Sequence, residues 1–219
     1  MSLNESKGNM YDFVTHTWNT VKGECPHGCT YCYMKRWGKQ RPVYFDKREM
    51  KADLGEGNFI FVGSSCDLFA DAIPYEWIGK TLEKCRWAHR NRYLFQSKNP
   101  GRIRTCDEYF PESSIVCTTI ETNRSYPCME HSPSPSLRVA GMETLRFPRF
   151  VTIEPILDFD LYPLIELVKR CEPLQVNIGA DSGRNGLPEP TAFQVAALID
   201  ELSKFTTIAR KTNLLRLLA

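Results

Sequence analysis

The sequence lacks the long apolar segments that secreted and membrane proteins carry. Its first eleven residues are polar, and no apolar run elsewhere is long enough to cross a bilayer. We therefore expect no membrane partner and a cytoplasmic location. The chain also lacks a large excess of charge of either sign. Its 28 Lys and Arg and 26 Asp and Glu give a net charge of +2. This balance neither requires nor excludes a nucleic-acid partner.

The chain also lacks the biased composition of disordered or fibrous proteins. Its 219 residues are 42% hydrophobic and 25% charged, as in ordinary globular chains. A chain of this length can bury one substantial core. We therefore predict a single domain over 1–219.

Cysteine, by contrast, is plentiful. An odd count of nine cannot pair completely within one chain, and without a secretion signal we expect reduced thiols. Three of them form a Cys-x3-Cys-x2-Cys run at Cys25, Cys29 and Cys32, in which Gly28 lets the backbone curl. The other six are scattered, at Cys66, Cys85, Cys106, Cys117, Cys128 and Cys171.

The spacing of the three clustered cysteines bears on the metal that they would hold. A structural zinc site needs four ligands, usually in two pairs, and no second Cys-x2-Cys or His-x3-His pair is present. An iron-sulfur cube has four irons to ligate, so three thiolates would leave one iron open to a ligand from outside the protein. The spacing therefore favours a reactive cluster over structural zinc.

This run resembles the signature of the radical S-adenosylmethionine (SAM) superfamily, in which an aromatic residue precedes the third cysteine. Tyr31 occupies that position. The resemblance implies that Cys25, Cys29 and Cys32 bind a [4Fe-4S] cluster and that SAM chelates the fourth iron. It also implies an external one-electron reductant of the flavodoxin or ferredoxin type. Reductive cleavage of SAM would then give a 5′-deoxyadenosyl radical that takes a hydrogen atom from the substrate.

Six apolar or β-branched runs predict the strands of an α/β fold. The runs lie at 16–21, 58–63, 92–97, 114–120, 150–156 and 174–179. Helical patterns lie between later runs, and a short helix is expected over 30–37, capped by Thr30 and ended by Gly38. This alternation is typical of parallel βα units. We predict a partial, TIM-like (β/α)6 barrel, which the resemblance also implies, with residues 206–219 adding a strand or helix that closes or flanks it.

Polar residues follow the predicted strands at the edge where parallel α/β folds bind ligands. Side chains alternate along a strand, so each strand presents one row of residues inward. The inward rows are Gln96 with Lys98; Cys117, Thr119 and Glu121; Phe150, Thr152 and Glu154; and Gln175, Asn177 and Gly179. Buried carboxylates and lysines are costly without partners, so these rows indicate a polar ligand or mutual pairing.

The turn after the second predicted strand departs from the pattern that the resemblance implies. In the family, a Gly-Gly-Glu-like turn binds the SAM ammonium, and Gly63-Ser64-Ser65 stands here without the carboxylate. Ser64, backbone carbonyl groups or Asp67 would then take over that contact.

The resemblance also implies roles for the later strand ends. Lys98 would balance the methionine carboxylate, and Glu121 or Asn177 would bind the ribose hydroxyls. Gly179 would let adenine approach the backbone, and Glu154 at the end of the fifth strand is the strongest further contact. For each residue the alternative is a structural polar group at the barrel rim.

For the substrate, the chain most resembles a compact phage and bacterial branch related to spore photoproduct lyase. The stretches that carry this likeness are 28–33, Gly-Cys-Thr-Tyr-Cys-Tyr, and 63–69, Gly-Ser-Ser-Cys-Asp-Leu-Phe. The likeness implies a nucleobase or nucleoside in DNA as substrate, modified or not, with isomerisation, lysis or modification as the outcome. A base within duplex DNA would have to be flipped out.

Basic and aromatic residues bear on the nucleic-acid prediction. Basic residues follow the cysteine motif and crowd the second predicted helix, where the alternative is a solvated helix face. They are Lys35, Arg36, Lys39, Arg41, Lys84, Arg86, His89, Arg90 and Arg92. The candidate stacking partners for bases are Tyr33, Trp37, Phe69 and Tyr126, with packing in the core as the alternative.

A Pro-, Ser- and Asn-rich segment, 122–136, is long for a βα loop and is either a lid or an ordinary surface excursion. Spore photoproduct lyase uses a cysteine as hydrogen-atom donor. By resemblance, Cys117 on an inward row or Cys128 in this segment would donate here, the alternative being simple packing.

Two further functions stay open on the sequence alone. One is the same radical chemistry on an amino acid, peptide or other metabolite. The other is a non-catalytic module that binds metal or nucleic acid. About four irons and sulfides per chain would indicate an enzyme, and stoichiometric zinc would indicate the module. Retention on DNA with a steep salt dependence would separate polynucleotide from small-molecule substrates.

Overall fold

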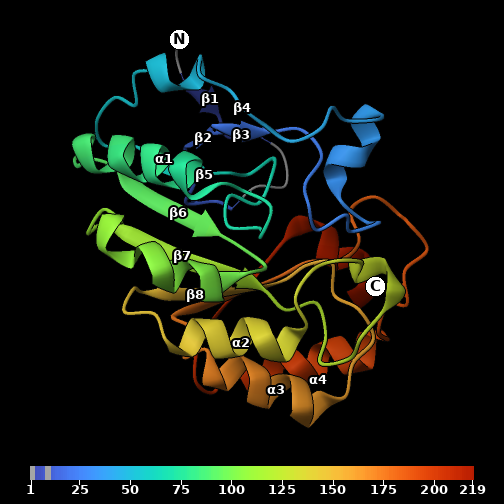
Figure 1. Cartoon of the computed structure of the whole chain (residues 1–219). Coiled ribbons are helices and arrows are strands. Elements are labelled where there is room, and N and C mark those ends of the chain that lie inside the picture. The colour runs from blue at the N-terminus through green and yellow to red at the C-terminus, as the bar shows by residue number, and fades with distance from the viewer. Residues whose placement is uncertain (1–2, 8–10) are drawn as a thin grey trace.

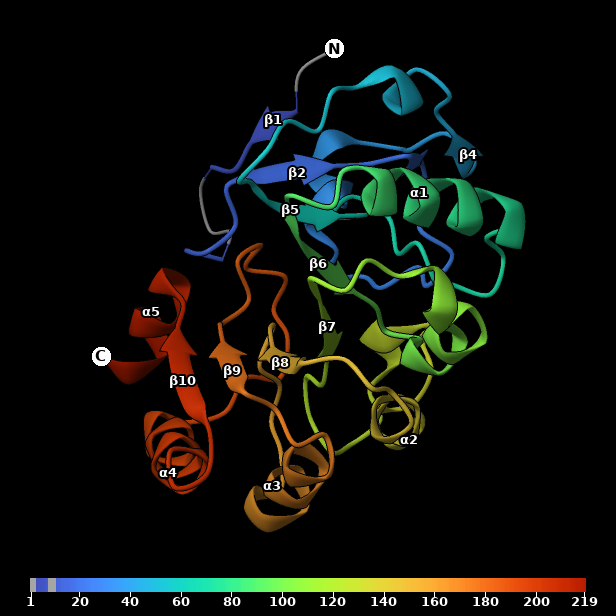
Figure 2. The same ribbon diagram turned by 90° about the vertical axis from the view of Figure 1, so that its left-hand side faces the viewer.

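The computed structural model describes residues 3–7 and 11–219. Its main sheet has eight strands: β1 (Asn4–Glu5), β2 (His16–Trp18), β5 (Phe59–Val62), β6 (Arg92–Gln96), β7 (Ser114–Thr119), β8 (Arg149–Ile153), β9 (Gln175–Ile178) and β10 (Thr207–Arg210). They lie in this order across the sheet. β1 runs antiparallel to β2, and every later neighbour pair is parallel. Figure 2 shows the strands along an open arc, so the sheet is a partial barrel.

Helices cover the convex side of this arc (Figures 1 and 2). The α-helices are α1 (Tyr75–Trp87), α2 (Pro135–Glu143), α3 (Leu161–Arg170), α4 (Ala192–Leu202) and α5 (Leu215–Leu218). The 3₁₀ helices are η1 (Tyr33–Trp37), η2 (Glu49–Lys51), η3 (Pro100–Tyr109), η4 (Pro127–Met129) and η5 (Thr212–Leu214). Sequence signals explain two of the starts. Thr191 and Gln194 form a capping box at α4, and the Ser134 side chain accepts a hydrogen bond from a backbone N–H of α2.

The predicted α/β class and parallel barrel are confirmed, but the strand count is larger than predicted. β10 adds a seventh parallel strand beside β9, and β1 adds an antiparallel one at the other edge. The stretch 206–219, expected to form a strand or a helix, forms both, because β10 is followed by η5 and α5.

The first predicted strand also ends earlier than expected. β2 stops at Trp18, and Val21 belongs instead to β3 (Val21–Lys22), which pairs with β4 (Tyr44–Phe45) in a separate small sheet. Asn19 explains the break, because its side-chain oxygen accepts hydrogen bonds from the Ser65 backbone N–H at 2.9 Å and the Ser64 hydroxyl at 3.2 Å. These contacts join the residue after β2 to the turn that follows β5.

The short helix predicted over 30–37 was too long. It forms only as η1, whose N-cap is Cys32 and which has no side-chain cap. The Thr30 backbone N–H donates instead to the Cys128 carbonyl at 3.0 Å. The predicted end was right. Gly38 follows η1 with a φ of 79°, a backbone conformation that glycine adopts without strain.

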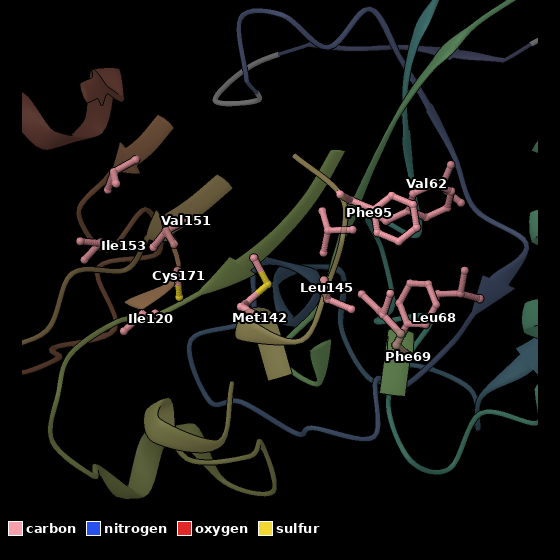
Figure 3. Packing of buried hydrophobic residues seen from close by; sticks show 14 of the residues in the cluster. Val62, Leu68, Phe69, Phe95, Ile120, Met142, Leu145, Val151, Ile153 and Cys171 are labelled. Carbon is pink, nitrogen blue, oxygen red and sulfur yellow. The ribbon is translucent and has the colours of Figure 1, made fainter. Parts of the chain in front are cut away.

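Two hydrophobic layers line the sheet. The outer layer joins the strands to the helices, and Figure 3 shows Val62, Phe95 and Phe69 packed there, with Cys171 in the same layer near Val151. Cys171 is thus a core residue, since a free cysteine packs as a small hydrophobic side chain. In the described part of the chain, no helix combines the length and apolarity that crossing a membrane requires.

The inner layer fills the concave side of the sheet. Side chains of β5, β6, β7 and β8 meet residues that precede β2, and the buried members are Tyr11, Val14, Phe59, Phe61, Leu94, Ile115, Cys117 and Phe150. The Tyr11 hydroxyl reaches Gln96 Oε1 and Thr152 Oγ1, each at 2.6 Å. The interior below the strand ends is therefore packed, and space for a ligand must lie above it, at the carboxyl edge.

Candidate functional site

The cysteine run lies in a curled loop between β3 and η1. Gly28 has a φ of 69°, and its N–H donates to the Cys25 carbonyl at 3.0 Å, while the Cys32 N–H donates to the Cys29 carbonyl at 3.2 Å. These two turns reverse the chain twice within eight residues. Cys29 is buried, and Cys25 and Cys32 are half-buried. The loop thus holds three thiols around one bend.

A buried carboxylate anchors this loop to the sheet. Asp67 Oδ2 lies 2.7 Å from His27 Nε2 and accepts hydrogen bonds from the Ser97 hydroxyl at 3.0 Å and the Lys98 backbone N–H at 2.8 Å. Burial opposes ionisation of Asp67, but the hydrogen bond and charge of His27 outweigh it and lower the pKa of Asp67. The ionised carboxylate therefore ties the loop to the ends of β5 and β6.

The structure brings a fourth sulfur to the loop. The thiol of Cys66, one of the scattered cysteines, hydrogen-bonds to Cys25 and lowers the pKa of Cys25 to about 6 against the effect of burial. That hydrogen bond and burial raise the pKa of Cys66 itself. Cys25 is thus favoured as a thiolate and Cys66 as a neutral donor. Burial raises the pKa of Cys32, so bound metal would have to draw the proton from that thiol.

The donor set does not suit a single metal ion. Within residues 3–7 and 11–219, no three His, Cys, Asp or Glu side chains are grouped so that they could share one ion. A four-iron cube makes a different demand, because each thiolate binds its own iron and the sulfurs stay apart. Three thiols on one curled loop match the number of protein ligands that a cube with one open iron would need.

A second group of charged residues lies directly beside the cysteines. Glu121 after β7 is fully buried and pairs with Lys98 Nζ at 2.6 Å and with Arg138 Nη1 at 2.6 Å, and it accepts a hydrogen bond from the Tyr31 hydroxyl. Burial would raise the pKa of Glu121, but the charges of Arg138 and Lys98 lower it to about 2. Lys98 Nζ also lies 3.4 Å from Cys29 Sγ. This network joins the cysteine loop to β6, β7 and α2.

Of the other predicted strand-end residues, Gly179 lies against Glu154, and Asn177 has other contacts. Lys211 Nζ lies 2.7 Å from Glu154 Oε2, and Asn213 Nδ2 donates to Glu154 Oε1 at 2.9 Å. A Cβ on Gly179 would come within 2.7 Å of Glu154 Oε1. Glycine at 179 therefore leaves room for the tip of the Glu154 side chain in this position. Asn177 is buried and accepts a hydrogen bond from Gln175 Nε2 at 2.7 Å.

The segment 122–136 packs against the cysteine loop. Besides the bond from Thr30 to Cys128, Ser132 Oγ lies 3.3 Å from Cys29 Sγ, and the His131 N–H donates to the His27 carbonyl at 3.0 Å. In Figure 1, β6 points toward the side of the molecule where η1 and this segment lie. The segment therefore flanks the candidate site, as a lid would.

The two candidate hydrogen donors lie at different depths. Cys128 is half-buried in the segment that contacts the cysteine loop. Cys117 is completely buried in the inner layer, where Sγ lies 3.3 Å from Thr152 Oγ1 and burial raises its pKa to about 12. Both thiols carry their hydrogen at neutral pH, because burial also raises the pKa of Cys128, but only Cys128 adjoins the loop.

The candidate stacking residues differ in their exposure to solvent. Phe69 is 1% exposed and stacks on Phe110 with ring centroids 5.7 Å apart, so for Phe69 the alternative, packing in the core, holds. Tyr33 and Trp37 are 41% and 69% exposed, and the Arg36 guanidinium lies over both rings. These η1 residues are accessible to a base or another flat ligand.

Several residues around the site were not identified from the sequence. Arg138 gave no signal, since arginine on a helix usually faces solvent, and here it is fully buried against Glu121. Lys211, which follows β10, and Asn213, on η5, lie in a stretch whose pattern did not separate strand from helix. A buried hydroxyl oxygen of Ser65 and Nη2 of Arg138 have no hydrogen-bond partner in the described structure. Both lie near the carboxyl edge, where a polar ligand would satisfy them.

This chain is similar to known proteins in its fold and not in its sequence. No family model and no curated protein matches this chain. Solved structures of spore photoproduct lyase do. A cysteine-to-serine variant aligns at a TM-score of 0.64 and 12% identity over 93% of this chain and 78% of that one. A tyrosine-to-phenylalanine variant aligns at 0.65 and 11% identity over 95% and 80%.

A third matching structure is a variant with bound AdoMet and dinucleoside spore photoproduct. It aligns at a TM-score of 0.62 and 12% identity over 93% of this chain and 66% of that one. Identity this low shows a shared fold alone. The resemblance proposed from the sequence is therefore confirmed at the level of the fold.

Proposed function

We propose that this chain is a radical SAM enzyme in which Cys25, Cys29 and Cys32 ligate a [4Fe-4S] cluster. The observation that carries the proposal is the placement of three thiols, on one curled loop, at the carboxyl edge of a parallel partial barrel. The likeness in fold to spore photoproduct lyase supports it. When bound, cluster and SAM together supply the electron transfer and the radical that takes hydrogen from a substrate.

The charges beside the loop support SAM as the ligand. Lys98 and Arg138 bring two positive charges to the single negative charge of Glu121. The methionine carboxylate would meet this excess at Lys98, while Glu121 would accept from ribose hydroxyls and Tyr31 would line the site. The unpartnered Ser65 hydroxyl and the Ser64 carbonyl, within the Gly63-Ser64-Ser65 turn, would face the ammonium.

The roles of Glu154, Asn177 and Gly179 in binding ribose and adenine stay predictions. Each has a structural role in the protein itself, since Asn177 contacts Gln175 and Gly179 makes room for Glu154. A ligand that reached Gly179 would have to displace the Glu154 side chain.

We also propose a nucleobase or nucleoside in DNA as the substrate. The support is the dinucleoside that a protein of the same fold binds, together with the accessible rings of Tyr33 and Trp37 beside the cysteine loop. Lys35, Arg36 and Lys39 are exposed on the same stretch and suit phosphate groups. Cys128 is the favoured hydrogen-atom donor because it adjoins the loop, and Cys117 is the second candidate.

The test is SAM cleavage by anaerobically reconstituted protein. With dithionite or a reduced flavodoxin as electron donor, we expect about four irons and sulfides per chain and release of 5′-deoxyadenosine from SAM. Cys29→Ala should abolish both. Cys66→Ala is the matched control, since it removes a sulfur next to Cys25 that we do not assign as a ligand, and it should keep both.

Two outcomes would contradict the proposal. One zinc per chain and no colour would favour a metal-binding module. Loss of the cluster in Cys66→Ala as complete as in Cys29→Ala would indicate four protein ligands and no open iron, which would contradict the proposal.

A further inference from the structure

Lys98 makes a contact that its proposed role toward SAM does not explain. Its side chain is 16% exposed, and Nζ lies within hydrogen-bond distance of the Tyr31 hydroxyl, 2.6 Å from Glu121 Oε1 and 3.4 Å from Cys29 Sγ. Nζ also lies 4.5 Å from the centre of the Tyr31 ring. An ammonium has three N–H groups, and each has an acceptor here, one of them a cysteine sulfur.

The position of this ammonium is held from both sides. Glu121 binds Lys98 through one carboxylate oxygen and the buried Arg138 through the other, and Arg138 donates further to the Thr119 carbonyl at 2.7 Å. The Glu121 carboxylate lies 2.6 Å from Nζ and favours the charged form of the lysine. Lys98 cannot move away from Cys29 without separating from Glu121.

A positive charge beside a cluster ligand changes the energetics of reduction. Reduction adds a negative charge to the cluster and its thiolates, and hydrogen bonds to the sulfurs raise the reduction potential. The effect is large where water is excluded, because a buried charge is poorly screened. Lys98 therefore stabilises the reduced cluster more than the oxidised one.

We propose that Lys98 is a positioning residue that raises the reduction potential of the cluster through its contact with Cys29. This inference rests on the proposed function, since it requires the cluster. It assigns Lys98 a role that is independent of SAM, so the effect should appear in protein that holds the cluster without SAM.

The experiment is a redox titration of reconstituted protein, followed by electron paramagnetic resonance of the reduced cluster. In Lys98→Gln, the ratio of reduced to oxidised cluster at a fixed solution potential should fall about tenfold, which is about 59 mV for one electron. Lys211→Gln is the matched control, because it removes another lysine paired with a glutamate at the same edge. Its ratio should stay within about twofold of the unmodified protein.

A second variant serves if Lys98→Gln does not fold or does not hold a cluster. Glu121→Gln removes the negative charge that offsets Lys98 and should raise the ratio of reduced to oxidised cluster. Equal potentials in Lys98→Gln and the unmodified protein would overturn this inference but not the proposed function. A ratio of reduced to oxidised cluster that is unchanged or lower in Glu121→Gln would do the same. Unmodified protein that takes up no cluster would overturn the proposed function and the inference together.

Discussion

Two lysine–glutamate pairs at the carboxyl edge have almost the same length and different surroundings. Lys98 and Glu121 are 2.6 Å apart, and Lys211 and Glu154 are 2.7 Å apart. Glu121 is fully buried and has Arg138 as a second cation, whereas the Glu154 side chain is 16% exposed. The two lysines are similar, at 16% exposed for Lys98 and 11% for Lys211. The charge of the fully buried Glu121 carboxylate is compensated by two cations, whereas water can reach Glu154 and share that compensation.

The two pairs also differ in what they suit: the first suits a ligand, and the second joins parts of the fold. The pair beside the cysteines carries an excess of positive charge, which suits an anionic group of a ligand. The Lys211 pair is joined by Asn213, and its lysine lies 4.5 Å from the centre of the Tyr11 ring. It therefore fastens the last strand and η5 to the inside of the barrel.

The largest expected effect comes from removing Arg138. Arg138→Met leaves Glu121 buried with one cation fewer, and we expect a loss of about 3–5 kcal/mol in the free energy of unfolding. Urea unfolding followed by circular dichroism measures it. A loss below about 1 kcal/mol would show that the buried network contributes little and that the contrast between the two pairs has no energetic basis.

Protonation of Glu121 at low pH should lower the free energy of unfolding. Its pKa falls from 4.5 to about 2 on folding. Its ionised form therefore stabilises the fold at pH values above 4.5, and this stabilisation, roughly 3 kcal/mol, is lost as the pH falls toward 2. Urea midpoints at several pH values should show this loss, and Glu121→Gln should show a flatter acid limb. An identical slope in both proteins would contradict the lowered pKa.

A smaller loss is expected at the second pair. Lys211→Met removes a partly exposed partner of Glu154, and water can compensate in part. We expect a loss of about 1–2 kcal/mol in the free energy of unfolding. The same urea experiment measures it. A loss as large as that of Arg138→Met would mean that the two pairs do not differ in the way their burial indicates.

The smallest effect is expected at Gly179. In Gly179→Ala the new methyl group would meet the tip of the Glu154 side chain, which can shift, so we expect a loss of about 1 kcal/mol. Gly141→Ala provides the contrast, because its Cβ would come within 2.4 Å of the Gly101 backbone nitrogen, which cannot shift as easily. An equal or larger loss at Gly179 would show that Glu154 is held rigidly.

Local patterns predicted the strands, their inward rows and the cysteine loop. Alternation along β7 and β8 placed Cys117 with Glu121 and Thr152 with Glu154, and in the structure Cys117 does meet Thr152 inside the barrel. Period two is a property of the strand itself, so it can be recognised without knowing the neighbours.

The missed features depend on contacts between distant segments. Arg138 is buried only because α2 packs beside the end of β7, and Tyr11 lies inside the barrel although it belongs to no strand. Cys66 meets Cys25 only because the turn after β5 lies under the cysteine loop. No periodicity within one segment reports such contacts, which arise from the packing of elements far apart in the sequence.

The most direct test of the account is Mössbauer spectroscopy of the reconstituted, iron-57-labelled protein before and after SAM is added. Three thiolate ligands leave one iron of the cube distinct, so SAM should change about a quarter of the iron signal and leave the rest in place. Cys66→Ala should show the same change. Four equivalent irons that do not respond to SAM, or the absence of any cluster, would contradict the claim that three cysteines hold a cube with one open iron.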